Sequence, residues 1–200
     1  MNSRFPILSF LFTIIFFTSN AQPKWELVKD KNGIKIYTSQ QADSKYKLVK
    51  VNALLPGKLE KVENLLQTPE NNKNWIFKTN ESYIIKRNSK DEIISYSSTA
   101  LPWPASDRDL VAKSNFKYNA DHSFKVILKG EQGIYPEKKN KVRVLFFYNT
   151  WDVKSDGKGN VMIDYFLQID PGGSLPAWVI NLFVAKGPYE TFMNLSQLIQ

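Results

Sequence analysis

One segment near the carboxyl end sets the architecture: Asp170-Pro-Gly-Gly-Ser-Leu-Pro-Ala-Trp-Val-Ile-Asn-Leu-Phe-Val-Ala-Lys-Gly-Pro-Tyr-Glu-Thr-Phe-Met-Asn-Leu195. Its apolar residues recur at steps of three and four, the spacing that places side chains on one face of an α-helix. A helix from Pro176 to Leu198 would be roughly 35 Å long, so it needs a broad apolar surface, such as a sheet of many strands. The predicted face comprises Leu175, Trp178, Leu182, Ala185, Tyr189, Phe192 and Ile199.

The same segment predicts where this helix begins and where it bends. Asp170-Pro-Gly-Gly is a turn sequence, and Pro176 suits the first helical turn because its missing N–H is not needed there. Gly187-Pro188 falls in the middle of the helix, where a proline removes a backbone hydrogen bond and its ring clashes with the preceding turn. We therefore expect a kink or a split near Lys186.

Most of the chain before this helix is predicted to be strands. Two begin near Ile34 and Val49, and six more are expected at residues 82–87, 92–100, 108–118, 122–130, 141–153 and 161–169, separated by polar turns. Two short helices, containing Val62 and starting at Thr68, are expected between the second and third strands, and another at residues 25–29. Short turns favour antiparallel neighbours, so the sequence predicts an α+β fold with one curved sheet of about eight strands.

Two motifs in order, Pro102-Trp-Pro-Ala-Ser-Asp-Arg-Asp-Leu-Val111 and Asp170 to Leu195, make the chain from about Trp25 to Gln200 resemble the START domain family of lipid-binding and lipid-transfer proteins. The resemblance implies the helix-grip fold, a large curved antiparallel sheet wrapped around a long C-terminal helix, as one domain over residues 22–200. It implies a single hydrophobic ligand, a lipid, held between the sheet and the helix. Some sterol-binding members carry a basic residue in the cavity where this chain has Ser114.

The inward faces of the strands mix large apolar residues with small or hydroxyl-bearing ones. From the residues alone, Ala112 and Ser114 either make room for Trp178 or Tyr189 in a solid core or line a cavity. The family resemblance favours the cavity. The expected ligand-binding residues are Leu110, Ala112, Ser114, Phe116, Val144, Phe146, Tyr148, Ile163, Tyr165, Leu167, Trp178, Leu182, Ala185, Tyr189 and Phe192.

The first motif contains a stiff loop and a charged triplet. Pro102 and Pro104 restrict the backbone on both sides of Trp103, which either packs into the core or stays at the surface. In START proteins the matching loop lies at the cavity mouth, so the resemblance implies a gate formed by Pro102, Trp103 and Pro104. Asp107, Arg108 and Asp109 are expected to be structural, pinning this loop through charge-assisted hydrogen bonds.

Residues 1–21 are predicted to be a cleaved signal peptide. Arg4 precedes an apolar run from Ile7 to Phe17, and Ser19-Asn-Ala21 places small residues where a signal peptidase cleaves, so we expect an exported protein, periplasmic or secreted. An uncleaved membrane anchor is the alternative. Without cysteine the domain must be stabilised by burial alone. Removing Arg4 with the leader leaves 26 basic and 19 acidic residues, a formal net charge of +7.

The sequence gives little support to an enzyme, metal or nucleic-acid site. His122 is the only histidine and the lysines are scattered, so we expect no cofactor, no metal, no nucleic acid and no catalytic residue. The expected partners are a lipid and, transiently, a membrane surface, and we expect a monomer. Two alternatives stay open: a helix-grip enzyme using Tyr148, Asp164, Tyr165 or Asp170, and an interaction module using the outer face of the sheet.

Overall fold

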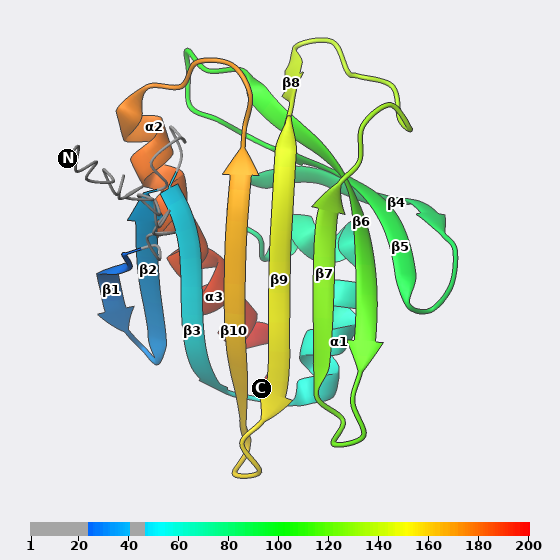
Figure 1. The fold of residues 1–200 in the computed structure, drawn as a ribbon, viewed down its shortest axis with the longest axis vertical. Coiled ribbons are helices and arrows are strands. Elements are labelled where there is room, and N and C mark those ends of the chain that lie inside the picture. Colours follow the sequence, from blue (N-terminus) through cyan, green and yellow to red (C-terminus); the bar gives the residue numbers. More distant parts are fainter. Residues whose placement is uncertain (1–23, 41–46) are drawn as a thin grey trace, which may run out of the picture.

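A computed structural model describes residues 24–40 and 47–200 of the protein. It shows one antiparallel sheet that curls around the C-terminal helix, with two short helices beside it (Figure 1). Within the described residues the sheet has ten strands, in the order β1-β2-β3-β10-β9-β7-β6-β5-β4, and β8 pairs with β6. The predicted signal peptide, residues 1–21, lies outside the described residues.

The strand bounds follow the prediction closely over most of the chain. The sheet comprises β1 (Glu26–Lys31), β2 (Ile34–Gln40), β3 (Lys47–Pro56), β4 (Thr79–Arg87), β5 (Glu92–Thr99), β6 (Asp107–Tyr118), β7 (Phe124–Gly130), β8 (Lys141–Arg143), β9 (Phe146–Ser155) and β10 (Asn160–Asp170). The predicted helix pair is confirmed as α1 (Leu59–Gln67) and a 3₁₀ helix (Pro69–Asn74), between β3 and β4.

The helix expected at residues 25–29 is wrong, because this segment forms β1. Asn32 and Gly33 have φ angles of 55° and 74°, which suits the two-residue turn of a β-hairpin. The turn folds β1 back on β2, with Lys31 opposite Ile34 and Leu27 opposite Tyr37. The turn preference of Asn32-Gly33 therefore has a stronger effect on the local structure than the helical pattern at residues 25–29.

The single strand expected at residues 141–153 is also wrong, because it is broken after Arg143. β8 pairs in parallel with the start of β6, whereas β9 pairs antiparallel with β7 and β10. Between them, the Leu145 amide donates a hydrogen bond to the Asp170 carbonyl at 3.0 Å, and the Leu145 side chain is 61% exposed. The break shifts the alternation of side chains by one residue from Phe146 onward.

The C-terminal helix is built from three consecutive pieces. These are α2 (Ala177–Asn181), a π-helical turn (Leu182–Lys186) and α3 (Gly187–Leu198). The irregular turn ends at Lys186, directly before Gly187-Pro188, where the sequence predicted a break. Proline cannot donate a backbone hydrogen bond, and the wider turn accommodates that loss. Gly187 also lets the helix pass close to Phe77, because an added Cβ would lie 3.1 Å from the Phe77 ring.

The hydrophobic core lies on the concave side of the sheet, between the strands and α3. It includes Val51 and Ile36 from the first strands, Trp75 from the segment before β4, Trp151 from β9 and Phe192 from α3. In Figure 1, α3 lies behind β3 and β10, and α1 lies behind β7. The packing leaves one part of the concave side unfilled.

Candidate ligand cavity

A cavity of about 290 Å³ lies between the concave face of the sheet and the C-terminal helix. Ligand pockets usually measure about 300–1,000 Å³, so this volume is at the small end of the range. Its walls come from α1 and the 3₁₀ helix, from β3, β4, β5, β6, β7, β9 and β10, and from all three pieces of the C-terminal helix. It therefore spans most of the width of the sheet.

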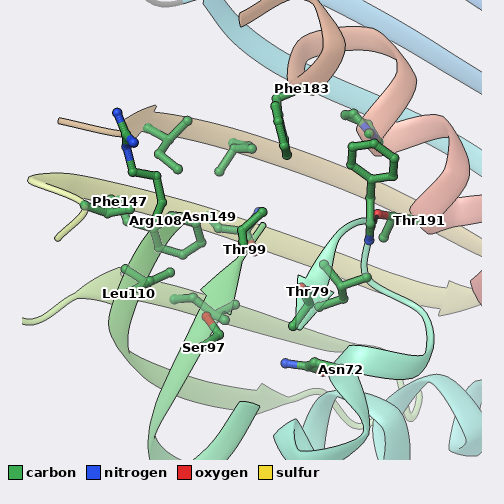
Figure 2. Close-up of a pocket in the computed structure, with 18 of the residues that line it drawn as sticks. Asn72, Thr79, Ser97, Thr99, Arg108, Leu110, Phe147, Asn149, Phe183 and Thr191 are labelled. Carbon is green, nitrogen blue, oxygen red and sulfur yellow. Dashed lines mark hydrogen bonds between the residues drawn. The ribbon is translucent and has the colours of Figure 1, made fainter. Parts of the chain in front are cut away.

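Hydroxyl groups are concentrated on the wall formed by β4, β5 and β6. β5 contributes Ser95, Ser97 and Thr99 at alternate positions, so all three point to the same side of the strand. Figure 2 shows Ser97, Thr79 and Asn72 on the wall opposite the helix that carries Phe183. This wall can accept or donate hydrogen bonds along most of its length.

The opposite walls are mainly apolar, and their polar side chains Asn149 and Thr191 already bond to the backbone of Phe166 and Phe77. β9 and β10 contribute Phe147, Leu167 and Ile169, while the helix contributes Val179 and Phe183. Farther along the same strands the cavity ends on a cluster of aromatic rings, which we call the aromatic base. In this base the Trp151 ring stacks on Phe192 with centroids 5.4 Å apart and meets Tyr165 and Trp75 edge-on at 4.9 and 6.1 Å.

Among the described residues that line the cavity, the ionisable side chains are Arg108 and Tyr165. The Arg108 guanidinium donates to three backbone carbonyls: Nη1 to Ser106 at 2.6 Å, Nε to Pro171 at 2.8 Å and Nη2 to Gly172 at 2.9 Å. Burial raises the pKa of the Tyr165 hydroxyl, against a smaller opposing effect of its hydrogen bond with Asn149, so this group is protonated at neutral pH. No carboxylate of the described residues lies in the wall.

Arg108 joins two loops, which together with α2 we call the loop end. One is residues 101–106, between β5 and β6, and the other is residues 171–176, which leads into α2. Both lie at the same end of the molecule in Figure 1, and Leu101 and Leu175 from these loops line the cavity. The guanidinium thus fastens the start of the C-terminal helix to the loop of the first motif.

The two aspartates beside Arg108 have their own partners. Asp107 accepts hydrogen bonds from the Leu101 amide at 3.1 Å and from Asn80 at 3.0 Å. Asp109 forms a buried two-pronged ion pair with Arg143 on β8, at 2.9 and 3.1 Å. Each member of the charged triplet therefore holds a different segment near the loop end through charge-assisted hydrogen bonds.

Trp103 lies at the tip of the first loop and is 89% exposed, so it is not part of the core. Pro104 follows it through a cis peptide bond, and Pro102 is half-buried. Trp178, on α2 at the same end, is 52% exposed. The loop end thus presents two large aromatic side chains to solvent, and a gating role for residues 102–104 stays a prediction.

The expected ligand-binding residues divide into two groups in the structure. Phe116 and Ile163 are buried in the core beyond the cavity, whereas Phe146 is 48% exposed and Tyr148 packs against Phe166 on the outer face. The residues that line the cavity are Leu110, Ala112, Ser114, Val144, Tyr165, Leu167 and Phe192.

The misplaced residues have two physical causes. The break between β8 and β9 turns Phe146 and Tyr148 outward and places Phe147 and Asn149 in the wall instead. The π turn adds one residue to a helical turn, so a stripe counted through it with a constant period changes face. Consequently Trp178, Leu182, Ala185 and Tyr189 lie outside the cavity wall, which Val179, Ile180, Phe183, Val184, Pro188 and Thr191 line instead.

The hydroxyls of β5 were missed, although the sequence carries their signal. Ser95, Ser97 and Thr99 alternate with Tyr96 and Ser98. A hydroxyl at every second position of a strand predicts one polar face, and only the neighbouring strands decide whether that face is inside. The register pairs Ser97 with Leu110 and Ser95 with Ala112, both of which line the cavity.

Residues 24–40 and 47–200 contain neither a metal-binding cluster nor a membrane-spanning helix. No group of histidine, cysteine, aspartate and glutamate side chains in this part of the chain is arranged to hold a metal ion. Among the same residues, no helix has the length and apolar character needed to cross a bilayer.

Comparison with known proteins identifies the family. Residues 18–197 match the START domain, so the chain belongs to the START domain family. The chain is 30% identical over 171 residues to an uncharacterized protein of Pseudomonas aeruginosa, covering 86% of this chain and 84% of that protein. It is 26% identical over 176 residues to phosphatidylcholine transfer protein of Mus musculus, covering 85% and 80% of the two chains.

A solved structure gives the same result for the fold. The crystal structure of a STAR-related lipid transfer protein fragment from Xanthomonas axonopodis matches with a TM-score of 0.79 and 28% identity, over 88% of this chain and 99% of that one. The helix-grip fold is therefore confirmed. Named relatives of this chain are lipid-transfer proteins, which supports a lipid as the general class of partner.

Proposed function

We propose that the protein binds one hydrophobic ligand, a lipid, in the cavity between the sheet and the C-terminal helix, and carries it between membranes. The main support for this proposal is the composition of the cavity wall, which is mostly hydrocarbon with hydroxyls on one side. Burying an acyl chain there is favourable by about 25 cal/mol per Å², while a few polar groups fix its orientation. The lipid-transfer relatives support the same class of ligand.

The placement of the candidate acids and bases supports a binding protein over an enzyme. Asp164 is exposed on the outer face, where it accepts a hydrogen bond from Asn52. Asp170 accepts a hydrogen bond from the Gly172 amide at 2.9 Å, and Tyr148 packs on the outer face against Phe166. Tyr165 does line the cavity, but burial raises its pKa and keeps it protonated. A general base would need a pKa near neutral pH.

The loop end supports transient contact with a membrane. Trp103, Trp178 and Leu145 expose apolar surface there, and tryptophan favours the interface between water and lipid. Arg108 couples the loop of Trp103 to the start of the C-terminal helix. We infer that a membrane engages this end and that the two loops separate to pass the ligand. An exported, monomeric protein would do this outside the cytoplasm.

Native mass spectrometry of the protein purified from its own source tests the proposal. A co-purifying lipid is expected, and it should be absent from the variant Ala112→Phe, because the added ring fills the cavity where Ala112 lines it. Ala120→Phe, in an exposed turn, is the matched control and should retain the lipid. Protein that is consistently empty, and that also fails to take lipid from vesicles, would contradict the proposed function.

A further inference from the structure

We infer that the ligand is a single-chain lipid with an uncharged polar end, held by the hydroxyl wall of β5 and β6. This inference rests on the proposed function and narrows its ligand class. It depends on three features of the cavity: its size, the unused hydroxyls, and the distribution of charge.

The size of the cavity favours one chain. A volume of about 290 Å³ is at the small end of the range for pockets that hold one ligand. A diacyl phospholipid brings two chains and a charged headgroup, so it would require the sheet and the helix to move apart. That separation would expose the apolar walls around Phe183 and Leu167.

The hydroxyl wall has hydrogen-bonding capacity that the protein does not use. Ser114 is only 3% exposed and lines the cavity, and Ser95, Ser97 and Thr99 line it on the adjacent strand. Across the described chain, no other residue forms a side-chain hydrogen bond with any of these four hydroxyls. A purely apolar ligand would displace water from them and leave them unsatisfied, which is unfavourable. A ligand oxygen at this wall would satisfy them.

The spacing of these groups fits a polar end with several oxygens. Alternate residues of a strand are about 7 Å apart, so Ser95, Ser97 and Thr99 form a row along β5. Ser95 lies opposite Ala112, whose small side chain leaves room at the wall, and Ser114 lies two residues further along β6. A glyceryl group with a hydroxyl and an ester oxygen can contact two of these side chains at once.

The charges in the wall select against ionised headgroups. In the described part of the wall there is no aspartate, glutamate, lysine or histidine. Arg108 is near the loop end, where its three nitrogens donate to backbone carbonyls. A carboxylate, phosphate or ammonium group beside Ser95 or Ser114, which lie at the level of residues four or more positions along β6 from Arg108 (about 13 Å or more), would therefore be buried without an opposite charge in contact. That burial costs far more than burying a hydroxyl or an ester.

Binding of three probes to the purified protein tests the inference. They are 1-monooleoylglycerol, oleate at pH 8, where its carboxyl group is ionised, and 1,2-dioleoylphosphatidylcholine, each titrated by native mass spectrometry. We expect 1-monooleoylglycerol to bind at least about tenfold more tightly than the other two, because its oxygens bond the hydroxyls without burying a charge. Tighter binding of oleate or of the phospholipid would overturn the inference.

The triple variant Ser95→Ala, Ser97→Ala, Ser114→Ala tests the wall directly. It should weaken the binding of 1-monooleoylglycerol by roughly 10- to 100-fold, since each neutral hydrogen bond contributes about fivefold to the affinity. The affinity for oleate should change by less than about threefold. Ser98→Ala is the matched control, because Ser98 is also on β5 but receives a hydrogen bond from Lys141 at 2.8 Å on the other face. If the triple variant fails to fold, Ser97→Ala alone should give about a fivefold loss.

The outcomes separate the two proposals. Equal losses of affinity for 1-monooleoylglycerol and oleate in the serine variants, or no loss at all, would overturn the inference that the ligand is uncharged and bound by the hydroxyls. Such a result would leave the proposed lipid binding intact. Failure of all three probes to bind the wild-type protein would contradict the proposed function as well as this inference.

Discussion

The aromatic base and the loop end use the same residue type in opposite ways. At the base, Trp75 and Trp151 are 1% and 4% exposed and pack edge to face. At the loop end, Trp103 and Trp178 are 89% and 52% exposed, and the segments around them are held by hydrogen bonds from Arg108 to backbone carbonyls. One end is closed by packing, whereas the other is fastened by polar contacts.

This difference predicts that stability depends mainly on the aromatic base, whereas the proposed exchange of lipid depends on the loop end. Buried aromatic rings that pack against one another cannot separate without exposing a large apolar area. Hydrogen bonds to backbone carbonyls can be exchanged for water or lipid headgroups at a smaller net cost, because water replaces the lost partners. We therefore expect substitutions at the base to lower the free energy of unfolding most, and substitutions at the loop end to change the rate of lipid transfer.

The largest effect is expected for Trp151→Ala at the aromatic base. Truncating a buried tryptophan that contacts Trp75, Tyr165 and Phe192 should lower the free energy of unfolding by about 3–5 kcal/mol. Urea denaturation followed by circular dichroism measures this loss. Tyr148→Ala, on the outer face of the same strand, is the control, and a loss as large as that of Trp151→Ala would show that the base has no special role.

Breaking the buried ion pair beneath the loop end should cost nearly as much. Asp109 and Arg143 have side chains 1% and 5% exposed, so Asp109→Asn leaves the guanidinium buried without its counter-charge. We expect a loss of about 3 kcal/mol in the free energy of unfolding. The exposed pair Lys125–Asp152 is the comparison, because Asp152→Asn should cost less than about 1 kcal/mol. Similar losses for the two variants in urea denaturation would contradict the prediction.

The ends also differ in how far the sequence could predict them. The motif from Pro102 to Val111 and the Gly187-Pro188 break are local signals, and the structure has a loop and an irregular turn at these places. Which residues form the cavity wall depends on the phase of the side chains along each strand and helix, and an error in phase carries over to every later residue of that element. A single extra residue, at the β8–β9 break or in the π turn, therefore moved Phe146, Tyr148 and Trp178 out of the expected wall.

The partners of the charged triplet could not be predicted for a different reason. Asp107, Arg108 and Asp109 are adjacent, but besides local contacts with Leu101 and Ser106 each has a partner at least 27 residues away along the chain. These distant partners are Asn80, Gly172 and Arg143, respectively. Successive residues of a strand point to opposite faces, so neighbours in β6 are poorly placed to pair with one another. Which distant segments meet them is decided by the sheet order, which no local pattern contains.

Arg108→Lys should loosen the loop end with a smaller loss of stability. A lysine keeps the charge but cannot contact three carbonyls in the fork geometry of arginine, so those of Ser106, Pro171 and Gly172 lose their shared donor. We expect about 2 kcal/mol less stability and faster lipid exchange between vesicles. Lys113→Arg, in the same strand, is the control. A loss of stability without faster exchange would mean that Arg108 supports the fold but does not control the exchange of lipid.

Trp103→Ala should have the smallest effect on stability of the four substitutions and a clear effect on transfer. Because the indole is 89% exposed, its removal should change the free energy of unfolding by less than about 0.5 kcal/mol. If it inserts into the lipid interface, the variant should bind vesicles more weakly and transfer lipid more slowly, while Trp103→Phe retains part of both activities. Stopped-flow transfer between donor and acceptor vesicles, with a thermal melt alongside, measures the two quantities together. An unchanged rate of transfer would contradict the proposed contact between the loop end and a membrane. A large drop in melting temperature would mean that the exposed indole stabilises the fold through the loop that carries it.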